Sequence, residues 1–257
     1  MLKAITREVS PGINGCELSF HPRQPIDVPR AVEQHKAYES YLRELGVQIV
    51  SLPAEPDLPD SVFVEDAALV TDEFAVITRP GRPSRQPETA TIADALSRYR
   101  PLKFMTTPAT LDGGDVMSIG KTLFVGRSAR TNDVAIAQLR DLLRPHGYDV
   151  KPVEVRGCLH LKTGCSYIGN NTILVNRSCV DARLFYRFDL LDVPDDEPAA
   201  ANALLIGDNV IIAASFPKTR ALLEERAFCV RTVDVSELQK AEAGVTCCSL
   251  IFRDEHT

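Results

Sequence analysis

The cysteines of this chain lack the spacing of a disulfide framework or of a structural zinc site. Seven cysteines are present, an odd number, and no two of them form a CxxC pair. Small disulfide-built folds use even sets of cysteines, and structural zinc sites use closely paired ones. We therefore expect most of the thiols to be reduced and buried, which leaves room for one reactive thiol.

Long apolar runs and an excess of positive charge are also missing. No stretch reaches the length of a membrane span, and residues 1–7 lack the apolar run of a signal peptide. The formal net charge of -6 argues against nucleic acid or an anionic membrane as the main partner. The sequence predicts a cytoplasmic protein without a nucleic-acid or membrane partner, and its acidic balance tolerates a cationic small substrate.

No linker or shift in composition divides the chain. A hydrophobic content of 44% and a charged content of 25% are ordinary for a globular protein. A length of 257 residues is enough for one large domain with a proper core. We predict one domain over residues 1–257.

What the sequence does contain is a repeated pattern of strand, tight hairpin, strand, helix and strand, roughly every 35 to 50 residues. The predicted hairpin strands are 61–70 with 74–78, 114–119 with 122–126, 165–168 with 172–176, and 203–206 with 210–214. A fifth copy has only the strand 246–252, and the N-terminal segment would supply its missing strand, helix and strand. Because closure removes sheet edges, we predict an α/β fold: a five-module pseudo-symmetric α/β propeller whose N-terminal segment completes the C-terminal module.

Polar residues interrupt the apolar pattern at corresponding positions of these modules. They are Asp60, Glu65 and Asp66 in the first module, Asp112 and Asp115 in the second, His160 in the third and Cys247 in the fifth. Each alone has an ordinary interpretation: a solvated acidic pair, a turn, a core histidine or a buried thiol. Their recurrence favours a shared site at the centre of the ring. We interpret the other histidines as structural or solvated: His21, His35, His146 and His256.

The predicted last strand gives the two adjacent cysteines different surroundings, because successive strand residues face opposite ways. Cys247 is the candidate nucleophile, and Cys248 should be dispensable for chemistry. A lone Cys-His-Asp set is a weak zinc signal, although zinc on Cys247 and His160 stays open. Nucleophilic catalysis fits better, with His160 as acid and base and Asp112 orienting it. The extra carboxylates would raise the pKa of a thiol, which makes sense if the substrate is a guanidinium cation.

Five motifs, in order and spread over the whole chain, carry a family resemblance. They are SVFVED at 61–66, ATLDGGD at 109–115, GRSARTN at 126–132, LHLKT at 159–163 and TCCS at 246–249. Together they resemble the dimethylarginine dimethylaminohydrolases, of the guanidino-group-modifying (pentein) superfamily. The resemblance implies hydrolysis of asymmetric Nω,Nω-dimethyl-L-arginine, and of Nω-monomethyl-L-arginine, to L-citrulline and dimethylamine or methylamine. It implies a covalent S-alkylthiouronium intermediate and no cofactor.

The resemblance also implies residue roles: Cys247 as nucleophile, His160 as general acid and base, and Asp112 orienting His160. The implied substrate-binding set is Glu65 and Asp66 on the guanidinium, Arg85 and Arg130 on the carboxylate, Asp60 on the α-amine, Leu18 in a lid loop, and Ala241. Some bacterial relatives carry glutamate at the position of Asp112. Aspartate keeps the carboxylate group but places it at a slightly different distance from the backbone. The lid segment 13–18 is not distinctive, and a solvated arginine would also explain Arg85.

Three other functions remain open. A hydrolase of free arginine and an amidinotransferase resemble this chain in core residues, but both are usually longer, and 257 residues leave no room for their inserted region. A non-catalytic sensor of arginine analogues would not need the Cys247, His160 and Asp112 set. The sequence allows a homodimer without predicting one.

Overall fold

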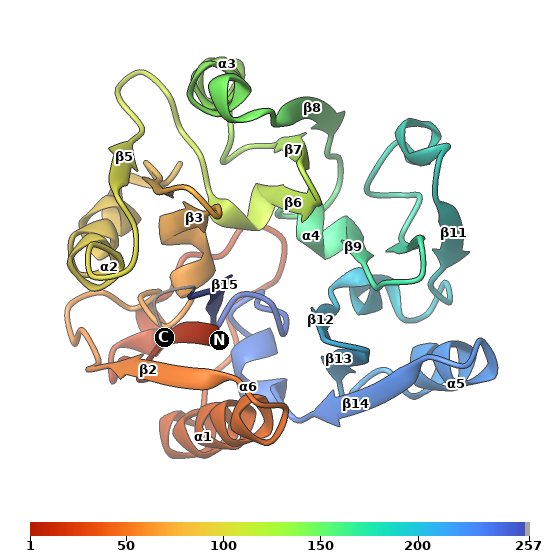
Figure 1. Cartoon of the computed structure of the whole chain (residues 1–257). Helices are drawn as coiled ribbons and strands as arrows, with labels where there is room; N and C mark the ends of the chain where they lie inside the picture. The colour runs from red at the N-terminus through yellow and green to blue at the C-terminus, as the bar shows by residue number, and fades with distance from the viewer. Residues whose placement is uncertain (255–257) are drawn as a thin grey trace.

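The computed structural model describes residues 1–254, and residues 255–257, which include His256, lie outside the described part. Within residues 1–254 the strands form five three-stranded sheets arranged in a ring (Figure 1). The sheets comprise β1 Leu2–Arg7, β2 Gln48–Leu52 and β15 Leu250–Arg253; β3 Ala68–Val70, β4 Ala75–Ile77 and β5 Leu102–Phe104; β6 Val116–Ile119, β7 Thr122–Arg127 and β8 Asp149–Glu154; β9 Cys165–Tyr167, β10 Thr172–Val175 and β11 Asp189–Asp192; and β12 Leu204–Ile206, β13 Asn209–Ala213 and β14 Cys229–Val233.

All five sheets share one pairing pattern. The first strand pairs antiparallel with the second across a hairpin, and the second pairs parallel with the third. The fifth sheet has the same pattern although its strands come from opposite ends of the chain: β15 pairs antiparallel with β1, and β1 pairs parallel with β2. The two chain ends therefore lie side by side, and the fold is the predicted five-module α/β propeller.

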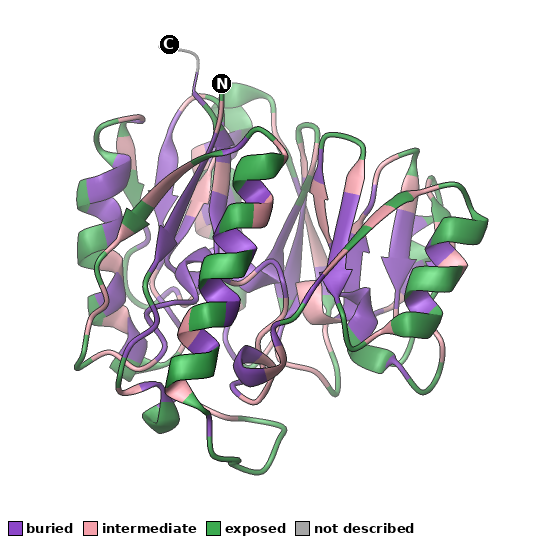
Figure 2. Ribbon diagram, turned by 90° about the horizontal axis from the view of Figure 1, so that it is seen from below, coloured by how far each residue is buried: buried purple, intermediate pink, exposed green. Residues whose placement is uncertain are grey.

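The α-helices are α1 Val28–Glu44, α2 Thr89–Leu96, α3 Asp133–Leu143, α4 Leu161–Gly164, α5 Pro217–Glu225 and α6 Ser236–Gln239. The longer helices α1, α2, α3 and α5 cover the outside of the ring, whereas the short α4 and α6 lie nearer its centre (Figure 1). The 3-10 turns are η1 Ile13–Gly15, η2 Val64–Ala67, η3 Pro83–Glu88, η4 Gly113–Asp115, η5 Arg144–His146, η6 Ala182–Phe185 and η7 Pro198–Ala201. In Figure 2 the strands inside are buried while the outer faces of the long helices are exposed. In the described part of the chain, no helix is both long and apolar enough to span a bilayer.

Helix α3 illustrates how the sequence builds one module. Asn132 caps it, because its side chain accepts a hydrogen bond from the backbone N–H of Ala135 at 3.0 Å. Ala135, Ile136, Leu139 and Leu143 are buried on one face, the spacing of an amphipathic helix. This face packs on β8 and on the core of its module.

Two predicted strands begin later than expected. Residues 61–70 are a strand only from Ala68, since Val64–Ala67 form η2. Cys247 and Cys248 lie in a turn, and β15 begins at Leu250. The apolar pattern in both places reflects burial around the centre of the ring and not a strand ladder. A backbone hydrogen bond joins the two turns instead: the N–H of Glu65 donates to the carbonyl of Cys247 at 3.2 Å.

Candidate active site

A cavity of about 450 Å³ opens at one end of the ring axis. The first strand of each sheet surrounds the centre in Figure 1, and the segments that precede these strands line the cavity. Seven predicted site residues line it: Asp60, Glu65, Asp66, Arg85, Arg130, Ala241 and Cys247. His160 lines it as well, and Asp112 lies directly behind His160. Leu18 is not among the lining residues and packs against the hydrophobic core instead.

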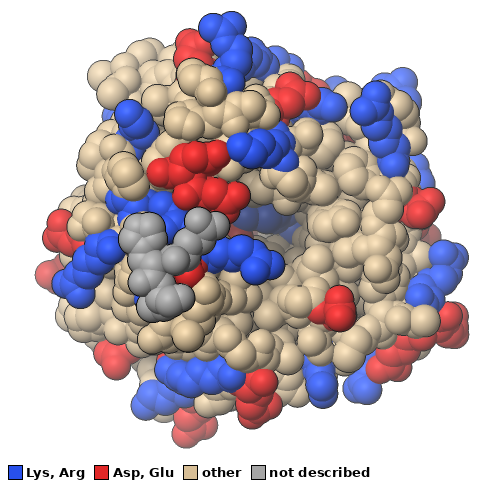
Figure 3. Space-filling view, in the orientation of Figure 1, with Lys and Arg blue, Asp and Glu red and all other residues tan. Residues whose placement is uncertain are grey.

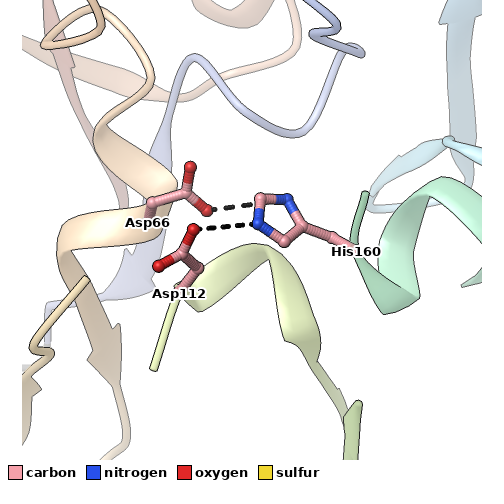
Figure 4. A group of neighbouring side chains, drawn as sticks. All are labelled: Asp66, Asp112 and His160. Atoms are coloured by element: carbon pink, nitrogen blue, oxygen red, sulfur yellow. Dashed lines mark hydrogen bonds and ion pairs between the residues drawn. The ribbon is translucent and has the colours of Figure 1, made fainter. Parts of the chain in front are cut away.

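The ring of His160 faces two buried carboxylates, which lie together on one side of it (Figure 4). Its Nε2 is 3.0 Å from Oδ2 of Asp112, and its Nδ1 is 4.0 Å from Oδ1 of Asp66. Burial by itself lowers the pKa of His160, but the charge of Asp66 and the hydrogen bond with Asp112 outweigh it and raise that pKa to about 9. At neutral pH the imidazole is therefore protonated and can act as an acid.

The Asp-Gly-Gly-Asp motif brings Asp112 up to the histidine. The backbone N–H of Gly81 donates to Oδ1 of Asp112 at 2.8 Å, which leaves Oδ2 for His160. Gly114 must be a glycine, because a Cβ there would lie 2.5 Å from Nδ1 of His160. Asp115 accepts hydrogen bonds from the hydroxyls of Ser128 and Thr131 and from the N–H of Leu161, so it supports the loop instead of facing the cavity.

Glu65 forms the floor of the cavity together with Lys162. The Nζ of Lys162 lies 2.5 Å from Oε1 of Glu65, and the hydroxyl of Thr246 donates to Oε2 at 2.8 Å. Burial raises the pKa of Glu65 against the opposing charge of Lys162. Lys162 belongs to the 159–163 motif, but no sequence signal assigned it a role. In the structure, Lys162 is the positively charged group that pairs with Glu65 at the bottom of the cavity.

The thiol of Cys247 is held in its protonated form when the cavity is empty. Burial first, and then the charges of Glu65 and Asp66, raise its pKa to about 12. Two groups work in the other direction: the N–H of Gly244 donates to Sγ at 3.3 Å, and the charge of Lys162 favours the thiolate. A bound cation near Glu65 and Asp66 would cancel their effect on the thiol. Cys248 is buried in the hydrophobic core and does not line the cavity.

The two arginines of the site are buried, so the solvated interpretation of Arg85 is wrong. Arg85 donates to Oδ2 of Asp66 at 2.6 Å and to both oxygens of Glu88. The pKa of Asp66 lies well below its usual range, because His160 and Arg85 outweigh the effect of burial. Arg130 lies 3.4 Å from Oδ2 of Asp112, and its buried Nε has no hydrogen-bond partner among the described residues.

A loop over residues 16–25 covers the mouth of the cavity, and Glu242 holds it. The carboxylate of Glu242 accepts hydrogen bonds from the successive backbone N–H groups of Ser19, Phe20 and His21, at 2.5 to 3.0 Å. Glu242 itself has φ +60°, a left-handed conformation that costs a non-glycine residue roughly 1–3 kcal/mol. No sequence signal pointed to this contact. His21, interpreted from the sequence as structural or solvated, is exposed at the edge of the cavity.

Asp66, Asp112 and His160 also meet a simple geometric requirement for binding a metal ion. Their ligand atoms lie within 4.8 Å of one another. Arg85 already pairs with Asp66, and Arg130 lies beside Asp112. Since these cations compensate both carboxylates, we interpret the three residues as an acid–base unit. Cys247 is not part of this group.

Comparison with known proteins identifies the family. A family model described as N,N dimethylarginine dimethylhydrolase, eukaryotic, matches residues 13–250. The chain is 39% identical to the N(G),N(G)-dimethylarginine dimethylaminohydrolase of Pseudomonas aeruginosa, over 91% of this chain and 92% of that protein. It is also 39% identical to the Streptomyces coelicolor enzyme of the same name, over 98% of this chain and 97% of that one. The chain belongs to the dimethylarginine dimethylaminohydrolase family.

Solved structures agree with this family assignment. A cysteine-to-serine variant of the Pseudomonas aeruginosa enzyme in complex with citrulline superimposes with a TM-score of 0.93 at 35% identity, covering 97% of this chain and 98% of that one. A histidine-to-glycine variant of a dimethylarginine dimethylaminohydrolase, an adduct with S-methyl-L-thiocitrulline, has a TM-score of 0.93 at 36% identity and covers 97% and 99%. The N-terminal domain of the arginine dihydrolase ArgZ shares the fold, with a TM-score of 0.86 at 19% identity and 99% coverage of both chains.

Proposed function

We propose that this member of the family hydrolyses asymmetric Nω,Nω-dimethyl-L-arginine to L-citrulline and dimethylamine, and Nω-monomethyl-L-arginine to citrulline and methylamine, with Cys247 as the nucleophile. The protein is a hydrolase that acts on a C–N bond of a linear amidine. The observation that carries the proposal is the meeting of one thiol, one protonated imidazole and two carboxylates in a single cavity. A guanidinium is the planar cation that such paired carboxylates bind.

Substrate binding activates the thiol in this mechanism. The guanidinium lies against Glu65 and Asp66, and its charge offsets the two carboxylates that hold the pKa of Cys247 at about 12. The thiol then loses its proton to solvent, because the imidazole is already protonated, and the thiolate attacks the guanidinium carbon, forming a C–S bond and a tetrahedral adduct. Arg85 and Arg130 attract the substrate carboxylate, and Asp60, which lies beside the loop over the cavity, accepts from the α-ammonium group. Ala241 lines the wall, and Leu18 contributes through the loop.

His160 completes both halves of the reaction. The imidazolium donates its proton to the departing dimethylamine as the C–N bond breaks, which leaves a covalent S-alkylthiouronium on Cys247. The neutral imidazole next takes a proton from water, whose oxygen attacks the same carbon. Collapse of the second adduct breaks the C–S bond and releases citrulline. Asp112 stabilises the imidazolium and keeps the ring in place.

The test is citrulline release from dimethylarginine and from arginine by the wild type, Cys247→Ser and Cys248→Ser. Activity on dimethylarginine that is lost only in Cys247→Ser would support the proposal. Activity on arginine alone would make the chain a deiminase, and no activity on either, with the protein folded, would favour a binding module. Covalent labelling of Cys247 by a haloacetamidine separates an enzyme that is inactive under the assay conditions from a non-catalytic sensor.

Two properties remain predictions from the sequence, and a third, the homodimer, is one that the sequence allows. We propose that the protein works in the cytoplasm, that residues 1–257 fold as one domain, and that it can form a homodimer. One cooperative unfolding transition in calorimetry would support the single domain. Sedimentation velocity at several protein concentrations would support or contradict the homodimer.

A further inference from the structure

Two cysteines that the mechanism does not use lie together in the wall of the same cavity. Cys158 precedes His160 by two residues, and Cys179 follows β10 by four. Both line the cavity, and they lie close enough for each thiol to shift the pKa of the other. An isolated antiparallel bridge between Val155 and Val180 joins the two segments, and the N–H of Arg156 donates to the carbonyl of Cys179 at 2.9 Å.

Gly164 makes this close approach of the thiols possible. A Cβ at residue 164 would lie 2.6 Å from Cβ of Cys179 and 3.6 Å from Sγ of Cys158, so both cysteines pack against the same glycine. The Sγ of Cys158 is also 3.5 Å from the carbonyl oxygen of His160. The pair is thus connected to the backbone of the residue that acts as acid and base.

Both thiols border space that a small reagent can enter, although Cys179 itself is buried. Cys158 is partly exposed in the cavity wall. Cys179 borders the cavity on one side and, on the other, a surface groove that also carries Arg156, Arg177 and Arg183. Arg177 and Arg183 already pair with Asp192 and Asp181.

We propose that Cys158 and Cys179 are a redox-sensitive dithiol, which a peroxide converts to a disulfide that slows turnover by displacing His160. In the first step one thiolate attacks a peroxide oxygen. The O–O bond breaks, water leaves after protonation, and the sulfur becomes a sulfenic acid. In the second step the other thiol attacks that sulfur, the S–O bond breaks, a second water leaves, and the S–S bond forms. The peroxide is reduced and the two thiols are oxidised, and an added dithiol reverses the reaction.

The neighbouring nucleophile reacts less readily under the same conditions. The thiol of Cys158 lowers the pKa of Cys179, whereas burial and two carboxylates raise the pKa of Cys247. Because the thiolate is the reactive form, Cys179 is the first of these cysteines to be oxidised in the empty enzyme. The reversible inactivation should therefore precede irreversible loss of Cys247.

Oxidation changes the position of His160 in two ways. It removes the S–H donor next to the His160 carbonyl, and it ties residues 156–160 to residues 176–179. Since a displacement of about 1 Å of a catalytic group can cost 10²-fold in rate, we expect kcat to fall by roughly tenfold to a hundredfold. This expectation about the rate rests on the proposed function, whereas formation of the disulfide does not.

The experiment treats the full-length wild type with hydrogen peroxide near neutral pH and follows both mass and activity. We expect a mass lower by two hydrogens, a peptide cross-link between Cys158 and Cys179, and loss of turnover that dithiothreitol reverses. Cys158→Ser and Cys179→Ser should form no cross-link and should keep their own untreated activity through the same treatment. Cys229→Ser, which removes an exposed cysteine on β14, should behave like the wild type.

Two results would overturn the proposal. One is wild-type protein that retains all its thiols, or that forms its cross-link between other cysteines. The other is equal inactivation of the wild type and of Cys158→Ser, because oxidation of Cys247 alone would then explain the loss. If Cys179→Ser does not fold, Cys158→Ser and Cys158→Ala decide the matter. The mass measurement stands even if dimethylarginine proves not to be the substrate.

Discussion

The two ends of the ring axis differ although the same five modules build both. At one end a cavity of about 450 Å³ is lined by the charged segments that precede the inner strands. At the other end a cavity of about 350 Å³ is lined largely by the inner strands themselves. Figure 3 shows the molecule hollowed at its centre. Glu65 and Lys162 border both cavities, so this ion pair separates them.

The difference shows where a propeller can place chemistry. Strand residues are committed to ladder hydrogen bonds and to the cores between sheets, so side chains there mainly stabilise the fold. The segments before the strands are free to adopt turns. They bring His160 and Cys247 from different modules to one cavity, with Asp112 from a third module behind His160. If this division holds, substitutions at the first end should change turnover and those at the second end should change stability.

The largest effect is expected at the thiol. Cys247→Ser removes the proposed nucleophile, and we expect kcat to fall by at least about 10⁴-fold. Cys248→Ser, one residue away but buried in the core, should retain turnover and lose only stability. Steady-state citrulline formation measures both. Comparable losses in the two variants would show that the turn as a whole, and not one side chain, carries the reaction.

The next effect is expected at the carboxylate behind the histidine. Asp112→Asn keeps the size of the side chain but removes the charge that supports the imidazolium, and we expect kcat to fall by about 10²- to 10³-fold. Asp208→Asn, in the exposed hairpin between β12 and β13, is the matched control at the other end. Wild-type turnover in both variants would contradict the proposed role of Asp112.

The pH dependence of stability should come from the catalytic end. The pKa of His160 is raised from 6.5 to about 9 in the folded protein. The stabilisation that this gives is complete below pH 6.5 and is lost as the pH rises through 9. It amounts to roughly 3 kcal/mol. Chemical denaturation between pH 6 and 10 should show this fall in the free energy of unfolding, and His160→Gln should flatten it. A variant as steep as the wild type would assign the dependence to another group.

At the opposite cavity we expect a change in stability without a change in chemistry. Met117 on β6 is buried and borders that cavity. Met117→Ala should lower the free energy of unfolding by about 2 kcal/mol and leave kcat/KM for dimethylarginine unchanged. Denaturant titration and steady-state kinetics measure the two quantities. A large fall in kcat/KM of the folded variant would show that the two ends are coupled.

The smallest effect is expected at the covering loop. Glu242→Gln weakens the charge-assisted hydrogen bonds to the N–H groups of Ser19, Phe20 and His21. We expect KM to rise by about three- to tenfold with a smaller change in kcat. Glu224→Gln, on exposed α5, is the matched control. An unchanged KM would mean that the loop stays in place without Glu242.

The sequence alone was sufficient to predict the repeat, the closure of the ring and most of the charged residues that line the cavity. Hairpins with tight turns recur at a regular interval, and an unfinished last module can be completed by the first residues of the chain. Chain-wide motifs then named Cys247, His160 and Asp112. The repeat and the closure of the ring could be predicted because they depend on local patterns of burial and turn formation, which the order of residues expresses directly. The roles of Cys247, His160 and Asp112 come from the family resemblance and stay predictions.

Only the tertiary structure decided what those residues touch. Cys247 lies in a turn before β15 and not in a strand. The apolar pattern around it comes from burial and not from strand pairing. Lys162 below Glu65 and Glu242 behind the covering loop are contacts across 97 and more than 200 residues. No periodicity records such contacts, since they arise when the ring closes. The protonation states of His160 and Cys247 were likewise set by neighbours that only folding brings together, because burial and nearby charges fix a pKa.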